Sequence, residues 1–217
     1  MSNTQLCKLS TLAEVAIGYQ HRERVLDAAH GTHLMIQARD VTYLDTPEND
    51  LSGWRLQTAN LDRVTPRGDA SRYRIEPGDV LFVSRGASNI AVPLVAPFVE
   101  PMPQNWDELI PAYIFYILRP DRSRILPEYL AWFINQPPSQ AYLARHSRGS
   151  LVKLLPKAVF EELEVSLPPI EVQQKITELD RLRAHEESLL RRLITTRQQL
   201  IQQTCLRVIT GQWQPQL

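Results

Sequence analysis

The chain has 217 residues, of which 43% are hydrophobic and 22% charged, the usage of a globular protein with a core of its own. Basic and acidic residues number 24 each, so no overall positive charge points to a nucleic-acid partner. No apolar run is long enough for a membrane helix, and the two cysteines have no metal or disulfide spacing. We therefore expect a cytoplasmic protein that does not contact membranes.

The first 150 residues alternate short β-prone runs with turn signals, which predicts a mixed α/β domain of the α+β class. The clearest strands are predicted at residues 33–38, 80–84, 91–96 and 113–118. Pro77-Gly78-Asp79 predicts a tight turn into the second of these strands, because proline and glycine supply the constrained and positive φ values. Two polar stretches, residues 46–50 and 65–70, predict surface loops.

Two short helices are predicted next. Residues 127–134 begin with a proline, which is tolerated at the first helical position because its missing N–H has no partner there. A second helix, at about residues 139–145, is expected to follow the Pro137-Pro138 break, and a small basic loop comes after it.

The segment from residue 148 to residue 176 predicts a joint. A Gly-Ser loop precedes a short strand, Pro156 opens a single helical turn, and Leu163, Val165 and Leu167 alternate as a half-buried strand. Pro168-Pro169 ends that strand rigidly and fixes the angle at which the next element leaves.

The last quarter predicts one long helix. Between Glu171 and about Thr210 there is neither proline nor glycine, and about 40 residues make a rod of roughly 60 Å, which Gly211 is expected to end. Leucines at a three-four spacing form a predicted apolar seam: Leu179, Leu182, Leu189, Leu193 and Leu200. Such a rod is too long to lie on a small domain, so we expect another helix, from this chain or from a partner, to cover much of its apolar stripe. The alternative is a long helix folded back on its own domain.

The sequence contains no glycine-rich phosphate loop, nucleophile elbow or His-Glu-x-x-His motif. The histidines of His30-Gly31-Thr32-His33 could approach one metal ion, but no cysteine or acidic cluster accompanies them, and turn or surface positions are favoured. We expect no catalytic residue, no metal and no cofactor in this chain.

Several segments resemble the specificity (S) subunits of type I restriction–modification systems. The end of a target recognition domain in that family is matched at Gly149-Ser150, Leu163, Leu167-Pro168-Pro169-Ile170, Gln173 or Gln174, and Ile176. The family's opening and its central pattern are matched at Leu9-Ser10-Thr11-Leu12-Ala13-Glu14-Val15-Ala16 with Gly18, Tyr73-Arg74-Ile75, Pro77-Gly78-Asp79-Val80-Leu81-Phe82 and Ser84-Arg85-Gly86. These segments cover nearly the whole chain in the family's order.

The resemblance implies a target recognition domain over residues 1–168, followed over residues 169–217 by a long helix that forms a coiled coil. Members of the family usually carry two of each in tandem, whereas this chain has one of each. The resemblance therefore implies a half-subunit that forms a homodimer through antiparallel helices. Pairing with a different half-subunit is also left open.

The function implied by the resemblance is sequence-specific reading of double-stranded DNA, one half-site per chain, with no catalysis by this subunit. Methylation would belong to partner DNA methyltransferase subunits, which bind S-adenosylmethionine. Whether a restriction (translocase–nuclease) subunit joins the complex is left open.

Base reading needs polar, adaptable loops on a rigid scaffold, and three loops provide them. The predicted DNA-binding residues are Arg22 and Arg24 in an early loop that also holds Gln20 and His21; Ser84, Arg85, Ser88 and Asn89 in a glycine loop; and Arg145, His146, Arg148, Ser150 and Lys153 in a basic loop. Arginine supplies 20 of the 24 basic residues, and its planar fork suits phosphate and guanine, although an arginine-rich codon usage would give the same count.

The neutral charge leaves an alternative open, namely an interaction module whose coiled-coil arm binds a partner protein and which never contacts DNA. That hypothesis predicts no salt-sensitive DNA binding. A third class, a small-molecule hydrolase, predicts a deep pocket lined by convergent titratable groups.

Overall fold

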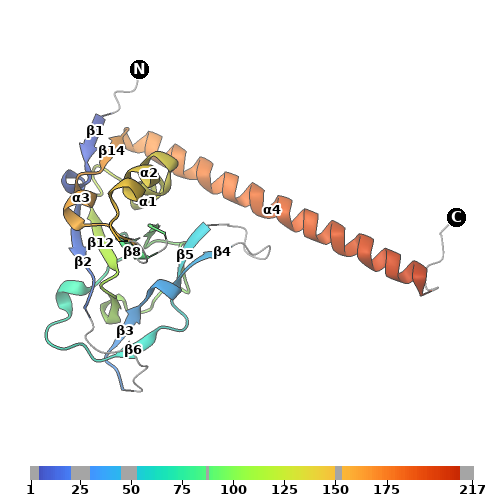
Figure 1. Ribbon diagram of the computed structural model, residues 1–217, viewed down its shortest axis with the longest axis horizontal. Coiled ribbons are helices and arrows are strands. Elements are labelled where there is room, and N and C mark those ends of the chain that lie inside the picture. The colour runs from blue at the N-terminus through green and yellow to red at the C-terminus, as the bar shows by residue number, and fades with distance from the viewer. Residues whose placement is uncertain (1–4, 21–29, 45–52, 87, 150–152, 211–217) are drawn as a thin grey trace. The chain divides into compact units, whose positions relative to one another are not determined.

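The computed structural model describes residues 5–20, 30–44, 53–86, 88–149 and 153–210 (Figure 1). The chain divides into two compact units. The first comprises Met1–Tyr43 and Trp54–Glu178, and the second comprises Leu44–Gly53 and Leu179–Leu217. The first unit holds the sheets and the short helices, and the second holds most of the long helix.

A four-stranded antiparallel sheet lies at the centre of the first unit, in the order β2-β12-β7-β9. Its strands are β2 (Ala13–Ile17), β7 (Val80–Val83), β9 (Ala91–Pro93) and β12 (Phe115–Pro120). Successive side chains of a strand point to opposite faces. Along β7, Val80 and Phe82 accordingly enter one core cluster, whereas Leu81 and Val83 enter another. All four side chains are buried, which explains why this stretch is apolar throughout instead of alternating.

Helices cover one face of the central sheet. They are α1 (Pro127–Asn135), α2 (Pro137–His146) and α3 (Lys157–Glu161). Phe160 of α3 stacks on Phe82 of the sheet with ring centroids 4.1 Å apart, and Tyr116 completes this aromatic cluster. An antiparallel pair, β1 (Gln5–Lys8) with β14 (Glu164–Leu167), borders the same core.

Small sheets cover the opposite face. One has the order β11-β3-β6 and another the order β10-β5-β4. Their strands are β3 (His33–Ile36), β4 (Val41–Leu44), β5 (Gly53–Gln57), β6 (Asp62–Val64), β10 (Val99–Glu100) and β11 (Leu109–Pro111). The remaining short elements are β8 (Arg85–Gly86), β13 (Lys153–Leu154) and four 3-10 helices, Leu9–Thr11, Ala38–Asp40, Ser71–Tyr73 and Trp106–Glu108. In Figure 1, α1, α2 and α3 lie at one end of the first unit and β3 and β6 at the other.

The predicted fold class is confirmed, with corrections to individual elements. The strand predicted at 33–38 ends at Ile36, because Gln37 starts a 3-10 helix whose backbone is capped by Asp40. The double proline does not break the chain before α2 but begins that helix, since the first two helical N–H groups need no partner. The strand predicted at 91–96 is shorter and ends at Pro93.

The long helix is confirmed as α4 (Ile170–Ile209), and Pro168-Pro169 separates it from β14 as predicted. Its first turns are fixed within the first unit by Gln173, whose side chain is fully buried. The Gln173 Oε1 accepts a hydrogen bond from the N–H of Leu126 at 2.9 Å, and its Nε2 donates to the carbonyls of Arg124 and Pro168, each at 2.9 Å. Leu126 is the N-cap of α1, so one amide connects the starts of two helices.

The remainder of α4 carries the leucine stripe. The five predicted seam leucines are 46–66% exposed, and every described residue from Leu189 onward is exposed. Ala184 and Ser188, on the opposite side of the helix, are buried. The coiled coil stays a prediction, and Gly211 lies outside the described residues. Among the helices described, α4 included, none has a stretch long and apolar enough to cross a membrane.

The turn into β7 contains a buried carboxyl group. Gly78 has a φ of 90°, as the predicted Pro-Gly-Asp turn requires, and the Asp79 side chain accepts a hydrogen bond from the N–H of Glu76 at 2.9 Å. Burial raises the pKa of Asp79 to about 6, and the Glu76 N–H and the guanidinium of Arg119 only partly oppose this rise. The turn therefore places a group that titrates near neutrality against the central sheet.

Replacing Gln173 with alanine should lower the free energy of unfolding by about 2–4 kcal/mol, because three backbone groups lose a buried partner. Urea unfolding followed by circular dichroism measures this change. Gln174 is the matched control, since its side chain is exposed and Gln174→Ala should change the free energy by less than about 0.5 kcal/mol. Equal effects of the two substitutions would contradict the role assigned to Gln173.

Asp79→Asn should change how stability depends on pH. The pKa of Asp79 is higher in the folded chain (about 6) than its ordinary value of 3.8, so between these values the unfolded state binds fewer protons. The free energy of unfolding therefore falls as pH rises from about 4 to about 6. Over that range the variant should gain on the order of 2–3 kcal/mol relative to the natural chain. Parallel pH profiles in urea unfolding experiments would show that this carboxyl does not titrate as stated.

Candidate nucleic-acid interface

Two of the predicted loops, distant in sequence, are joined by backbone pairing. The glycine loop follows β7 and contains β8, and the basic loop leads from α2 to β13. β8 and β13 pair antiparallel, with Lys153 opposite Gly86 and Leu154 opposite Arg85. The N–H of Leu155 also donates to the carbonyl of Ser84 at 3.0 Å. The two loops therefore form one surface, which we call the loop surface.

Within the basic loop, the chain closes on itself. Arg148 and Leu154 exchange two backbone hydrogen bonds of 2.8 Å each. Ser150 lies outside the described residues, so its DNA contact stays a prediction.

Two of the predicted DNA-binding residues hold the loop surface together. Ser84 is buried, and its N–H and its hydroxyl both donate to the carbonyl of Ile114 at 2.8 Å. The Asn89 Nδ2 donates to the carbonyl of Val83 at 2.9 Å, and the hydroxyl of Ser147 donates to the Asn89 Oδ1 at 3.3 Å. Ser84 and Asn89 therefore fix the path of the glycine loop and connect it to the basic loop.

Three basic side chains of the loop surface are more exposed than those of Ser84 and Asn89. Arg145, Arg148 and Lys153 are exposed, and in the described part of the chain their side chains make no hydrogen bond or ion pair. Ser88 is exposed as well. The His146 ring is half-buried, with its Nδ1 2.8 Å from the carbonyl of Tyr142. The loop surface thus offers free cationic groups at its rim.

Arg85 has a partner that was not among the predicted site residues. Its Cζ lies 5.0 Å from the ring centroid of Tyr113, which is 39% exposed. Tyr113 directly precedes Ile114, whose carbonyl holds Ser84. The sequence predicts a strand from Tyr113, but Tyr113 and Ile114 form the turn between β11 and β12, which begins at Phe115. Tyr113 is found as a site residue only through the tertiary structure.

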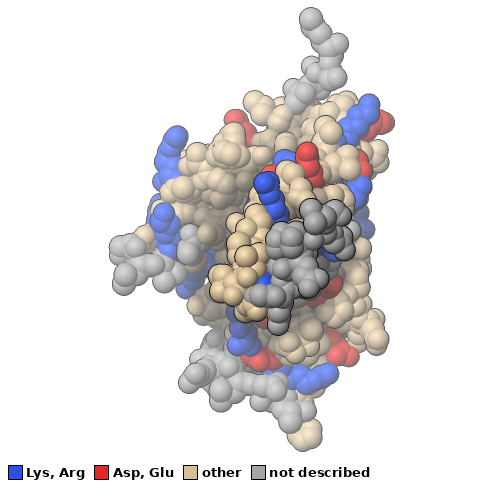
Figure 2. Space-filling model, turned by 90° about the vertical axis from the view of Figure 1, so that its right-hand side faces the viewer, with Lys and Arg blue, Asp and Glu red and all other residues tan. Residues whose placement is uncertain are grey.

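The local charge of the loop surface differs from that of the whole chain. Residues 80–99 contain Arg85 and no acidic residue, and residues 129–160 contain four basic residues and no acidic one. Of these four, Lys157 pairs with Glu161 of its own helix at 3.3 Å. On the face drawn in Figure 2, basic and acidic side chains are mixed. The sequence therefore contains a signal for both loops, namely two stretches without Asp or Glu.

The early loop leaves the fold close to Tyr113. Tyr19 forms a parallel bridge with Ala112, and its N–H donates to the carbonyl of Pro111 at 2.7 Å. Gln20 follows and is exposed. His21, Arg22 and Arg24 lie outside the described residues, so their DNA contacts stay predictions.

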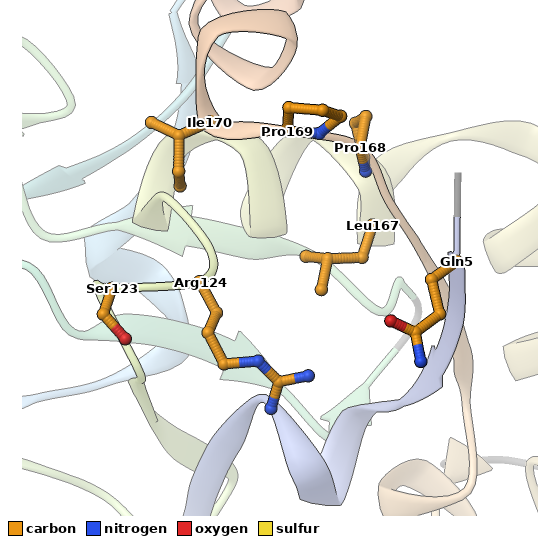
Figure 3. A pocket seen from close by; sticks show the side chains of 7 residues that line it. All are labelled: Gln5, Ser123, Arg124, Leu167, Pro168, Pro169 and Ile170. Carbon is orange, nitrogen blue, oxygen red and sulfur yellow. The ribbon is translucent and has the colours of Figure 1, made fainter. Parts of the chain in front are cut away.

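A pocket of about 770 Å³ lies at the joint between β14 and α4 (Figure 3). It is lined by Gln5, Ser123, Arg124, Leu167, Pro168, Pro169 and Ile170. The guanidinium of Arg124 donates to the carbonyl of Thr11 at 2.7 Å. This pocket does not supply the convergent titratable groups that the hydrolase hypothesis requires. In the part of the chain that the structure describes, no three His, Cys, Asp or Glu side chains come together as metal ligands.

Comparisons with known proteins give a match at the level of the fold. No protein-family model matches the sequence, and no curated protein does. Solved structures do match. The type I restriction–modification S subunit from M. genitalium matches with a TM-score of 0.50 and 9% identity, over 82% of this chain and 38% of its own. The HsdS subunit from Thermoanaerobacter tengcongensis matches with a TM-score of 0.54 and 15% identity, over 88% of this chain and 39% of its own.

The fold is therefore that of type I restriction–modification S subunits, a β-rich domain followed by a long helix. This confirms the resemblance to S subunits that the sequence motifs indicated, at the level of the fold. The chain spans about two-fifths of the length of these solved structures.

Proposed function

We propose that this chain is the DNA-recognition subunit of a type I restriction–modification complex and reads one half-site of a bipartite target without catalysing a reaction. The observation that carries the proposal is the pairing of β8 with β13. It gathers Arg85, Arg148 and Lys153 on one surface. The fold shared with S subunits supports the same assignment.

We assign two kinds of DNA contact to the loop surface, to phosphates and to base edges. Arg148 and Lys153 are exposed and have no side-chain partner among the described residues. They are suited to phosphate oxygens, because such contacts need charge rather than exact geometry. Contacts to base edges need side chains held in a defined orientation on a rigid scaffold. The central sheet supplies that scaffold, since both loops are hydrogen-bonded to strands of the core or to each other.

The proposed partners dock on α4. Its exposed leucine stripe is an apolar surface of the kind that associating helices bury, and we assign it to a second copy of this chain packed antiparallel. Two copies would then present two loop surfaces to two half-sites. DNA methyltransferase subunits, carrying S-adenosylmethionine, would bind the paired helices and modify the target.

Replacing Lys153 with methionine should weaken binding to duplex DNA of any sequence, because one phosphate contact is lost. The slope of log K against log salt concentration should shrink by about 1, and affinity at about 0.1 M salt should fall by up to about eightfold. Fluorescence anisotropy of a labelled duplex, titrated at several salt concentrations, measures both quantities.

Lys175→Met is the matched control, since Lys175 is exposed on the first turns of α4 and lies outside the loop surface. It should leave both slope and affinity unchanged. If the natural chain shows no salt-dependent binding to duplex DNA, the proposed function fails and the alternative, an arm that binds only a partner protein, takes its place.

The double substitution of Leu193 and Leu200 by glutamate should convert a dimer into a monomer, because it places charges in the apolar seam. Light scattering should give twice 24.9 kDa for the natural chain and 24.9 kDa for the variant at the same concentration. Gln202→Glu is the control, because Gln202 lies nine residues from Leu193 and hence on the opposite side of the helix. A monomeric natural chain would exclude pairing through this seam.

A further inference from the structure

We propose that Arg85 reads a guanine in the half-site through the major groove, and that Tyr113 is the positioning residue that orients its guanidinium. The inference rests on the proposed DNA-recognition function and names one base that this function would select. Neither residue belongs to any of the three hydrophobic clusters found among the described residues, so core packing does not account for their arrangement.

The contact between the two side chains is a stack of a cation on an aromatic ring. The Arg85 Cζ is 5.0 Å from the Tyr113 ring centroid, within the range of a favourable cation–π interaction. The Nη1 of Arg85 is 3.4 Å from the Tyr113 hydroxyl, which is long for a hydrogen bond. The ring, rather than the hydroxyl, therefore orients the guanidinium.

No carboxylate competes for this guanidinium among the residues described. Arg85 has no ion pair there, although Arg55, Arg74 and Arg119 are each within 4 Å of an acidic side chain. A guanidinium that stacks on a ring but has no acidic partner keeps most of its five N–H donors free.

The backbones that carry the pair are fixed with respect to each other. Arg85 lies in β8 opposite Leu154, and the preceding Ser84 makes two hydrogen bonds to the carbonyl of Ile114, the neighbour of Tyr113. Gly86, which completes β8, has a φ of 147°, a conformation that residues with a side chain rarely adopt. Both side chains thus start from adjacent, rigid positions on the loop surface.

Guanine is the base that fits this arrangement. It offers two acceptors, O6 and N7, at the spacing of the arginine fork, and this bidentate pair is the commonest specific contact in the major groove. A guanidinium already held by a ring loses less side-chain entropy on binding than a free one. Arg145, Arg148 and Lys153 are exposed and stack on no aromatic ring among the described residues, so we assign them to phosphate contacts.

The test is selection of duplexes from a randomised library by the full chain, alone and with a methyltransferase subunit, followed by sequencing. The natural chain should select a G·C pair at one fixed position. Arg85→Lys keeps the charge but loses the fork, and the preference at that position alone should fall about 5-fold to 150-fold. Tyr113→Leu should weaken the same preference several-fold, while Tyr113→Phe, which keeps the ring, should retain it.

Arg72→Lys is the matched control, because the Arg72 Cζ also lies over a tyrosine ring, 4.7 Å from the Tyr73 centroid, but outside the loop surface. It should leave every base preference unchanged. Circular dichroism melting of each variant establishes that it is folded, and Arg85→Lys, which changes only a half-exposed side chain, should melt with the natural chain. Selection of an unchanged sequence by Arg85→Lys would overturn the inference and leave the proposed function standing. Failure of the natural chain to select any sequence would instead refute the proposed function itself.

Discussion

The burial of β7 on both faces is the constraint on which the rest of the first unit depends. A strand of four apolar residues can be stable only if one layer accepts Val80 and Phe82 and another accepts Leu81 and Val83. The helices α1 to α3 form the first layer, and the small sheets of β3 to β6 form part of the second. The same strand carries the glycine loop at its end, so the position of that loop is determined by the core.

On the loop surface, the residues that hold the backbone in place are different from the residues that are exposed. Ser84 and Asn89 use their hydrogen bonds to hold the loop surface, whereas Arg145, Arg148 and Lys153 extend from it with free donors. Exposed residues of this kind can be substituted without cost to the core. Gln173 fixes the start of α4 through three hydrogen bonds of its buried side chain, so the first turns of that helix are equally well defined.

The distribution of charge explains how a neutral chain can be suited to DNA. Overall charge affects long-range attraction, but contacts depend on the charge within a few ångström, because salt screens exposed charges beyond about 8–10 Å. Residues 80–99 and 129–160 are free of carboxylates, and β8 and β13 bring parts of both together. The neutral total of the chain therefore conceals a cationic surface.

Elements whose signals are local could be predicted from the sequence alone. The 40-residue helix, its leucine stripe, the Leu-Pro-Pro joint and the β7 strand each follow from propensity or periodicity within a few residues, and three loops could be nominated from their composition. Which short segments become strands could not be predicted from local signals. β10 pairs with β5, and β8 with β13, across more than 40 residues of sequence. In addition, a strand of two residues has no periodicity to detect. Only the tertiary structure decided that Ser84 is buried and that Arg85 meets Tyr113. A side chain's neighbours depend on how distant segments pack, and no local pattern carries that information.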